Sequence, residues 1–121
     1  MSEEVSRVLG PLEAEVMQVM WAAHRPLGVR AVLGSLNEQR ETPLAYTTVM
    51  TVMSRLADKE ILRRELNGRG YLYEAAVADA ATIAVRNVVR DFGEAAVAGF
   101  VDQARADPTL RARLERLLRD E

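Results

Sequence analysis

Small hydroxyl side chains recur at helical spacing near the middle of the chain. The segment AYTTVMTVMSRLADK, which begins at residue 45, places apolar side chains at the i, i+3, i+4 and i+7 positions of one buried stripe: Val49, Val52, Met53 and Leu56. The face opposite that stripe carries Thr47, Thr51, Ser54 and Asp58, and its flanks carry Thr48, Met50 and Arg55. Hydroxyl groups can hydrogen-bond to phosphates or base edges, and Thr methyls can contact the thymine methyl group. The pattern therefore predicts a helix that lies closely against another surface, and DNA fits its chemistry.

A basic hairpin is predicted directly after this helix. Two strand-like runs, residues 62–66 and 71–75, flank the glycine-rich segment NGRG, which is typical of a short hairpin loop. Tyr71 and Tyr73 share one face of the second run, where the simplest interpretation is that they anchor the hairpin to the core. Arg69 stands at the tip between two glycines, and we expect it to reach a backbone phosphate or the minor groove. The candidate DNA-binding residues are Thr47, Thr48, Thr51, Ser54, Arg55, Arg63, Arg64 and Arg69.

Two further helices and a short strand are expected to position these residues. Apolar spacing predicts helices over residues 11–24 and 29–40, separated by a break that contains a proline and a glycine. We expect Leu27 to form a very short strand and Gly28 to be the N-cap of the second helix. The predicted fold class is mainly α with a small β-hairpin wing: a winged helix-turn-helix DNA-binding domain in residues 1–77.

Residues 78–121 have a different composition, rich first in Ala and Val and then in Leu and Arg. Breaks at Gly93 and Pro108 predict three short helices, over residues 78–92, 94–105 and 108–120. Their apolar stripes exceed what a small winged helix can cover, and an apolar face without an internal partner usually marks an interface. A two-fold dimer is the commonest solution, so we predict a helical dimerisation region. Its candidate contact residues are Val89, Phe92, Val97, Phe100, Val101, Leu110, Leu114, Leu117 and Leu118.

Most kinds of site chemistry have no residues to carry them. The 121-residue chain contains no Cys, one His and none of the GxxxxGK[ST], GxGxxG or HExxH patterns. We assign no chemistry to His24, and we predict no enzyme activity, no metal site and no cofactor. The N-terminus lacks a signal-peptide pattern and no apolar run is long enough to span a bilayer, so a cytoplasmic protein is expected. The terminal acidic pairs, Glu3-Glu4 and Asp120-Glu121, are expected to be disordered.

The net charge of −2 argues against a protein that coats nucleic acid by bulk charge. The distribution of charged residues along the chain weakens that objection, because residues 45–73 carry five Lys or Arg against three Asp or Glu. This local excess is modest, and a mixed-charge surface of this kind is usually just solvated.

Three segments of the chain resemble a known protein family. LGPLEAEVMQVMWAAHRPLGVRAVLGSL, LAYTTVMTVMSRLADKEIL and GYLYEAAV are similar to the penicillinase-repressor (BlaI/MecI-type) family of bacterial transcription factors. The segment AYTTVMTVMSRLADK is the specific part, and the resemblance covers residues 9–77 strongly. It implies a homodimeric repressor of an inverted-repeat operator, with the third helix in the major groove and the C-terminal helices joining the subunits. Thr47, Thr48, Thr51 and Arg55 match the family's recognition-helix contacts, and Arg69 matches its wing tip.

The resemblance also implies partners and signals. A membrane-bound sensor protease is associated with cleavage of the classical members at an Asn-Phe bond. This chain has Gly99-Phe100 there, a departure from the family pattern that argues against induction by cleavage of this bond. The copper-responsive branch carries C-terminal cysteines, which this chain lacks, so copper sensing is not expected. Genes of β-lactam or cell-envelope stress are the candidate targets.

Two alternatives to this repressor stay open. A winged helix can also be a protein–protein adaptor that does not touch DNA, and the sequence pI of about 5.5 favours that interpretation. A ligand-responsive winged-helix regulator is the alternative among DNA-binding proteins. Operator sequence, target genes and inducing signal cannot be read from the residues.

Overall fold

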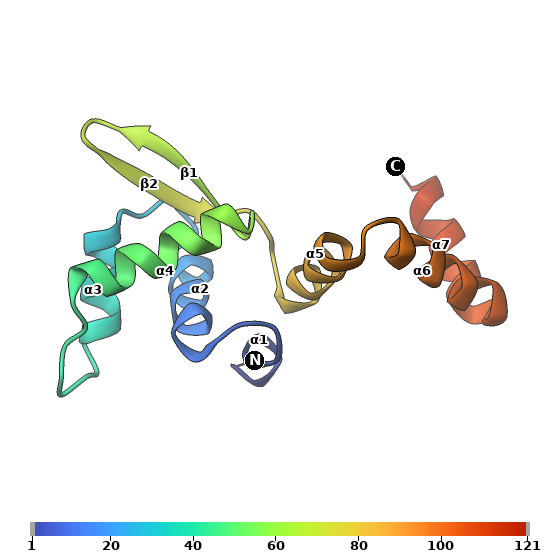
Figure 1. Ribbon diagram of the computed structural model, residues 1–121, viewed down its shortest axis with the longest axis horizontal. Helices are drawn as coiled ribbons and strands as arrows, with labels where there is room; N and C mark the ends of the chain where they lie inside the picture. The colour runs from blue at the N-terminus through green and yellow to red at the C-terminus, as the bar shows by residue number, and fades with distance from the viewer. Residues whose placement is uncertain (1, 121) are drawn as a thin grey trace. The chain divides into compact units, whose positions relative to one another are not determined.

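Helix α4 (Tyr46–Asp58) carries the hydroxyl face. It belongs to a compact unit together with the helices that precede it in the sequence and the two strands that follow it. The computed structural model describes residues 2–120, and the chain divides into two compact units, residues 1–83 and 84–121. In the first unit, which we call the head, the other elements are α1 (Ser2–Val8), α2 (Pro11–Ala23), α3 (Val29–Asn37), β1 (Leu62–Asn67) and β2 (Gly70–Ala75) (Figure 1).

Strands β1 and β2 form an antiparallel hairpin, the predicted wing. Their register pairs Leu62 with Ala75 at the base and Asn67 with Gly70 at the tip. An isolated bridge joins Leu27 to Tyr73, with backbone hydrogen bonds of 2.8 Å in both directions. The short strand expected at Leu27 is thus confirmed. Together with α2, α3 and α4, the three extended segments make a winged helix-turn-helix, as predicted.

The core of the head is built from the predicted apolar stripes. Val49, Met53 and Leu56 of α4 are fully buried, and Val52 is partly buried. For α2 the sequence predicts a stripe of Leu12, Val16, Val19, Met20 and Ala23, which omits Met17, although Met17 is also fully buried. The other core residues are Val5, Leu9, Ala14, Val16, Met20, Leu27, Val29, Val32, Leu36, Ile61, Leu62, Tyr73, Val77 and Ile83.

Helix α1 was not expected from the sequence, and the predicted disorder of Glu3-Glu4 is wrong because both residues lie within this helix. The physical reason is apolar burial just beyond them: Val5 and Leu9 are buried in the core of the head. Those two side chains tie the segment to the rest of the head, which orders the charged residues between them and the N-terminus. At the other terminus Asp120 is the C-cap of α7, and Glu121 lies outside the described residues.

Helix α3 ends at Asn37, three residues before the predicted end. The side chain of Asn37 hydrogen-bonds to the backbone of Leu44, which is beyond the turn. Asn side chains compete in this way with the backbone bonds of a helix, so the chain leaves the helical path here. Gly28 is the N-cap of α3, as expected.

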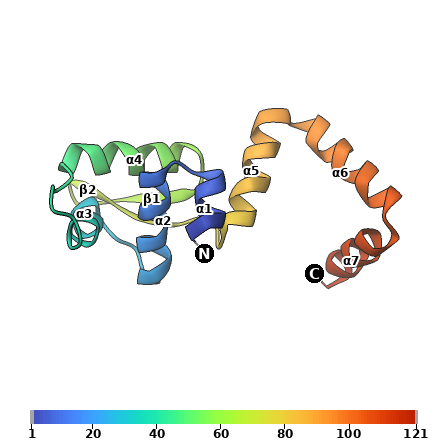
Figure 2. The same cartoon turned by 90° about the horizontal axis from the view of Figure 1, so that it is seen from below.

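The second unit contains α6 (Glu94–Ala106), α7 (Pro108–Arg119) and most of α5 (Ala80–Phe92) (Figure 2). The three predicted C-terminal helices are therefore present, with ends within two residues of those expected. Asp107 caps α7 by accepting hydrogen bonds from the backbone N–H groups of Thr109 and Leu110. Asp79 caps α5 in the same way, and hydrogen bonds from the backbone and then the hydroxyl of Thr82 lower the pKa of its carboxyl group.

Most of the candidate dimerisation residues are exposed in the single chain. Leu110 and Leu114 are half-buried, in keeping with the packing of α6 against α7. The exposed ones are Val89, Phe92, Val97, Phe100, Val101, Leu117 and Leu118. Exposed apolar side chains of this size are what an interface requires, and dimerisation stays a prediction.

Candidate nucleic-acid interface

The predicted hydroxyl face of α4 is open to solvent. Thr47, Thr48 and Thr51 are exposed, and Ser54 is half-buried. Arg55 is exposed, and its side chain makes no hydrogen bond or ion pair with any residue that the structure describes. The face exists because the apolar stripe on the other side of α4 is buried, which turns these short side chains outward.

Arg64 of β1 joins the wing to this face. Its Nη1 donates a hydrogen bond to Ser54 Oγ at 3.1 Å, and its guanidinium lies over the ring of Tyr71, 4.8 Å from the ring centroid. Hydrogen bonding to the side chain of Tyr73 is the largest cause that raises the pKa of Arg64 above its ordinary value. Two of the predicted DNA-binding residues, Ser54 and Arg64, are therefore bonded to each other in the free protein.

Arg63 lies on the opposite face of the wing from Arg64. It pairs across the hairpin with Glu74, with Nη2 3.1 Å from Oε1 of the carboxylate. Successive side chains of a strand point to opposite faces, so the adjacent positions 63 and 64 could not both face α4. That alternation was visible in the sequence, and it separates Arg63 from the other candidates.

An open groove of about 320 Å³ lies between α4 and the wing. Four of the eight predicted DNA-binding residues line it, namely Thr51, Ser54, Arg55 and Arg64. Its remaining walls are Met50, Tyr71 and Tyr73. Tyr73 is buried and anchors the wing, as the sequence suggested, whereas Tyr71 is exposed and carries the Arg64 guanidinium.

Arg69, at the wing tip, is not among the residues that line this groove. Gly68 precedes it at the first position of the turn with φ of +65°, a backbone conformation that glycine adopts readily. Arg69 is exposed and, among the described residues, has no hydrogen-bond or ion-pair partner. The tip therefore offers an unpaired cation at a site separate from the hydroxyl face.

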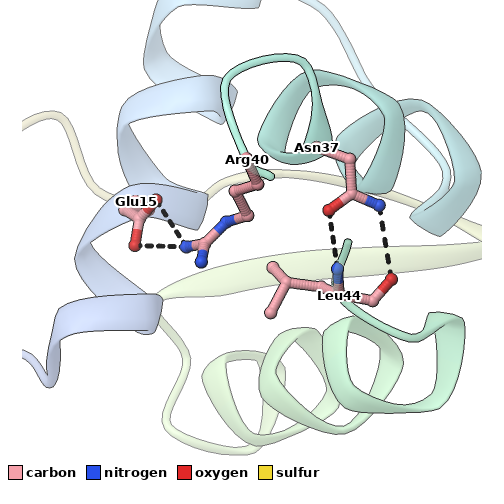
Figure 3. Close-up of polar contacts among 4 residues, drawn as sticks. All are labelled: Glu15, Asn37, Arg40 and Leu44. Atoms are coloured by element: carbon pink, nitrogen blue, oxygen red, sulfur yellow. Dashed lines mark hydrogen bonds and ion pairs between the residues drawn. The ribbon is translucent and has the colours of Figure 1, made fainter. Parts of the chain in front are cut away.

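The turn between α3 and α4 sets where the hydroxyl face begins. Asn37 Nδ2 donates to the carbonyl oxygen of Leu44 at 3.3 Å, and the Leu44 N–H donates to Asn37 Oδ1 at 2.8 Å (Figure 3). Arg40 Nη2 contacts both carboxylate oxygens of Glu15 on α2, at 2.9 and 2.8 Å (Figure 3). Leu44 directly precedes Ala45, the N-cap of α4, so these bonds fix the start of α4 relative to α2 and α3.

One residue and one pair beside the hydroxyl face were not among the candidate site residues. Met50, which the sequence placed on the flank of that face, is 41% exposed and lines the groove. The guanidinium of Arg30, on α3, lies over the ring of Tyr46, on α4, 5.1 Å from the ring centroid. The periodicity of one helix does not predict which residues of another helix it contacts, so the sequence could not predict this pair.

The charges beside the hydroxyl face are mixed: Asp58, at the C-terminal end of α4, is a counter-charge that adds to the larger effect of Tyr73 in raising the pKa of Arg64, whereas the N-terminal end of the face has none within the described chain. The first turns of α3 and α4, as the structure describes them, contain no acidic residue. Lys59, which the sequence counts within the basic segment, is instead paired with Glu13 of α2 at 3.2 Å. Among the described residues, Arg30 and Arg55 are exposed, unpaired cations near the face, and Arg69 is a third at the separate wing tip.

Within residues 2–120, no group of three or more His, Cys, Asp or Glu residues could hold a metal ion. None of the helices described there has the length and hydropathy needed to cross a bilayer.

Comparison with known proteins agrees with this geometry. Residues 9–120 match the family model described as penicillinase repressor. Transcriptional regulator BlaI of Mycobacterium tuberculosis, from strains CDC 1551 / Oshkosh and ATCC 25618 / H37Rv, is 43% identical over 65 residues. That match covers 54% of this chain and 46% of each relative, so the matched part spans just under half of the relatives' length.

Solved structures give the fold. The chain is similar to hsRosR-S1, from a complex structure, with a TM-score of 0.53 and 16% identity over 94% of this chain and 92% of that chain. It is similar to hsRosR-S4, also from a complex structure, with a TM-score of 0.53 and 18% identity over 99% of this chain and 95% of that chain. At these identities the likeness shows a shared winged-helix fold and nothing more. Since the family model matches all but the first few residues and the last one, the chain belongs to the penicillinase repressor family.

Proposed function

We propose that this protein is a homodimeric transcriptional repressor that binds an inverted-repeat operator. The observation that carries the proposal is the exposed hydroxyl face of α4, which borders a groove with Arg55 and Arg64 in a member of a repressor family. An α-helix fits the major groove of B-DNA, where each base pair presents a distinct pattern of donors and acceptors. In this arrangement α4 is the recognition helix and the wing contacts the DNA backbone.

The roles of the candidate residues follow from their surroundings. Thr47, Thr48 and Thr51 are open to base edges or phosphates because they are exposed and short. Arg55 and Arg69 are unpaired cations within the described chain, so they are the proposed phosphate contacts. Arg63 already has a carboxylate partner in Glu74, so its contribution to DNA binding is expected to be smaller.

Dimerisation is proposed because one winged helix makes few base contacts. Two linked heads can bind half-sites on successive turns of the duplex. Their base contacts then add, so the affinity of each single head need not be high. The exposed apolar side chains of α5, α6 and α7 supply the kind of surface that a subunit contact needs. The protein would act in the cytoplasm, with β-lactam or cell-envelope stress genes as candidate targets.

Release from DNA is proposed to involve a membrane-bound sensor protease. Gly99 and Phe100 are exposed within α6, at the position that the family resemblance associates with cleavage. Gly99 replaces the Asn of the family's cleaved bond, so this position argues against a cut at this bond itself and leaves the rest of the C-terminal region as the candidate. A protease would first have to open a helix of that region locally, and local opening is easiest where few apolar contacts hold a segment. Incubating the full chain with membranes from cells exposed to a β-lactam, followed by mass spectrometry, would identify any bond that is cut.

The test of DNA binding is selection from a pool of random duplexes, followed by mobility shifts over a range of salt concentrations. A repressor should enrich an inverted repeat and show tighter binding to it than to random duplex, with affinity falling as salt rises. An adaptor that does not bind DNA should give no shift with either duplex, even at low salt. That result would overturn the proposal.

A further inference from the structure

Arg30 and Tyr46 form a contact at the N-terminal end of the hydroxyl face. Arg30 lies in the first turn of α3, and Tyr46 is the first residue of α4. The guanidinium lies over the tyrosine ring at 5.1 Å from the centroid, and both side chains are exposed, Tyr46 by 39%. The contact therefore joins the two helices of the helix-turn-helix at the molecular surface.

The bonding state of Arg30 differs from that of the arginines that pair within the protein. Arg40 and Arg63 give their N–H groups to the carboxylates of Glu15 and Glu74. Arg30 makes no hydrogen bond or ion pair with the residues that the structure describes. A guanidinium that stacks on an aromatic ring keeps its N–H donors, because those point outward in the plane of the group. Tyr46 thus orders Arg30 without using any of its donors.

The position of the pair fits the spacing of DNA phosphates. Tyr46 directly precedes Thr47, and Arg55 lies nine positions further along α4, a rise of roughly 13 Å at 1.5 Å per residue. The major groove is about 12 Å wide. Arg30, held beside the start of α4, and Arg55 are therefore separated along α4 by a distance comparable to the groove width, with the hydroxyl face between them.

We propose that Arg30, held in place by the ring of Tyr46, contacts a backbone phosphate of the operator beside the start of α4. This inference rests on the proposed function, since it adds a second anchoring cation to the same interface. A phosphate accepts paired N–H bonds from a guanidinium, which gives the contact a fixed geometry as well as a charge. Neither residue is among those that the sequence pattern suggested.

The experiment measures binding of the full-length protein to the selected duplex and to random duplex by fluorescence anisotropy, from low to moderate salt. Arg30→Ala should weaken binding to both duplexes by a similar factor, roughly three- to tenfold near physiological salt, and should flatten the slope of log affinity against log salt by about 0.9. Tyr46→Leu, which removes the ring and keeps Arg30, should weaken binding to both duplexes by a smaller factor. Arg30→Lys, which keeps the charge, should keep the slope.

Arg25→Ala is the matched control, since it removes an exposed arginine of the head with no partner among the described residues and should leave the slope unchanged. Thermal unfolding of each variant checks that the head stays folded. If Arg30→Ala keeps the parental slope while the parent binds DNA, the phosphate contact is refuted and the proposed function stands. If the parent itself shows no salt-sensitive binding, the proposed function fails, and this inference fails with it.

Discussion

The Nη1 atom of Arg64 in the wing lies 3.1 Å from Ser54 Oγ on α4 and donates a hydrogen bond to it. This bond connects the wing to the proposed recognition helix. The sequence placed both residues among the candidate DNA contacts without a link between them. In the folded chain they are bonded to each other, so the placement of the wing against α4 is expected to depend on both.

The hydrogen bond between Ser54 and Arg64 is expected to stabilise the head. Ser54→Ala and Arg64→Ala should each destabilise the head slightly, and a double-mutant cycle in urea unfolding should give a coupling energy of about 0.5–1.5 kcal/mol. The coupling is expected because each single change already removes the shared hydrogen bond. Thr47→Ala, combined with Arg64→Ala, is the control and should be additive. Additive energies for Ser54 and Arg64 would mean that the bond has no role in holding the wing.

Thr51 is expected to read base identity. Thr51→Ala should reduce discrimination between the selected operator and single-base variants by about 1 kcal/mol at the position it contacts, because the methyl and hydroxyl contacts are lost. Competition binding with a panel of single-base variants measures this. Thr42→Ala, in the exposed turn before α4, should leave the panel unchanged. An unaltered ranking with Thr51→Ala would place the base contacts elsewhere.

Arg69 at the wing tip is expected to contact the backbone without reading sequence. Arg69→Ala should weaken binding to operator and random duplex alike and flatten the salt slope by about 0.9, the value for one phosphate. Arg69→Lys should retain the slope. Binding isotherms at four or five salt concentrations measure it. A loss confined to the operator would instead indicate base recognition by the tip.

Asn37 is expected to position α4. Asn37→Ala removes both hydrogen bonds to the backbone of Leu44 and leaves those two part-buried groups unpaired, so unfolding free energy should fall by about 1–3 kcal/mol. The ratio of operator to random-duplex affinity should fall as well, because α4 no longer starts in a fixed place. Asn37→Asp keeps the acceptor and should lie between parent and Asn37→Ala. Glu38→Ala, at the exposed neighbouring position, should change neither quantity.

Leu117 is a better position than Leu114 for testing dimerisation. It is 67% exposed, whereas Leu114 is half-buried, where α6 packs against α7, so a change at Leu114 also disturbs the folding of that pair. Leu117→Asp should bury a charge at the proposed subunit contact and shift the protein to monomers in sedimentation analysis, with a steep loss of operator affinity at nanomolar protein. Arg113→Ala on the same helix should leave the dimer intact. A dimer that survives Leu117→Asp would remove this residue from the contact.

The local periodicities of the sequence were enough to predict most of the head. The apolar stripe of α4, the hairpin around residues 67–70 and the bridge strand at Leu27 follow from helical spacing, turn residues and alternation, which act between near neighbours. The hydroxyl face was predicted in the same way, since burying one side of a helix exposes the other. Helix α1 was missed because its amphipathic pattern is too short to detect before its contacts with the core are known.

The sequence by itself determined most of the helices and strands apart from α1, which side of α4 faces outward, and the family to which the chain belongs. Only the tertiary structure decided which side chains meet: Arg64 with Ser54, Arg30 with Tyr46, Arg40 with Glu15, and Trp21 Nε1 with the carbonyl oxygen of Val77, 2.8 Å away. These partners are 10 to 56 residues apart, and their meeting depends on how whole elements pack around the core. The period of a helix or strand fixes a side chain's direction on its own element, whereas a contact requires the relative placement of two elements.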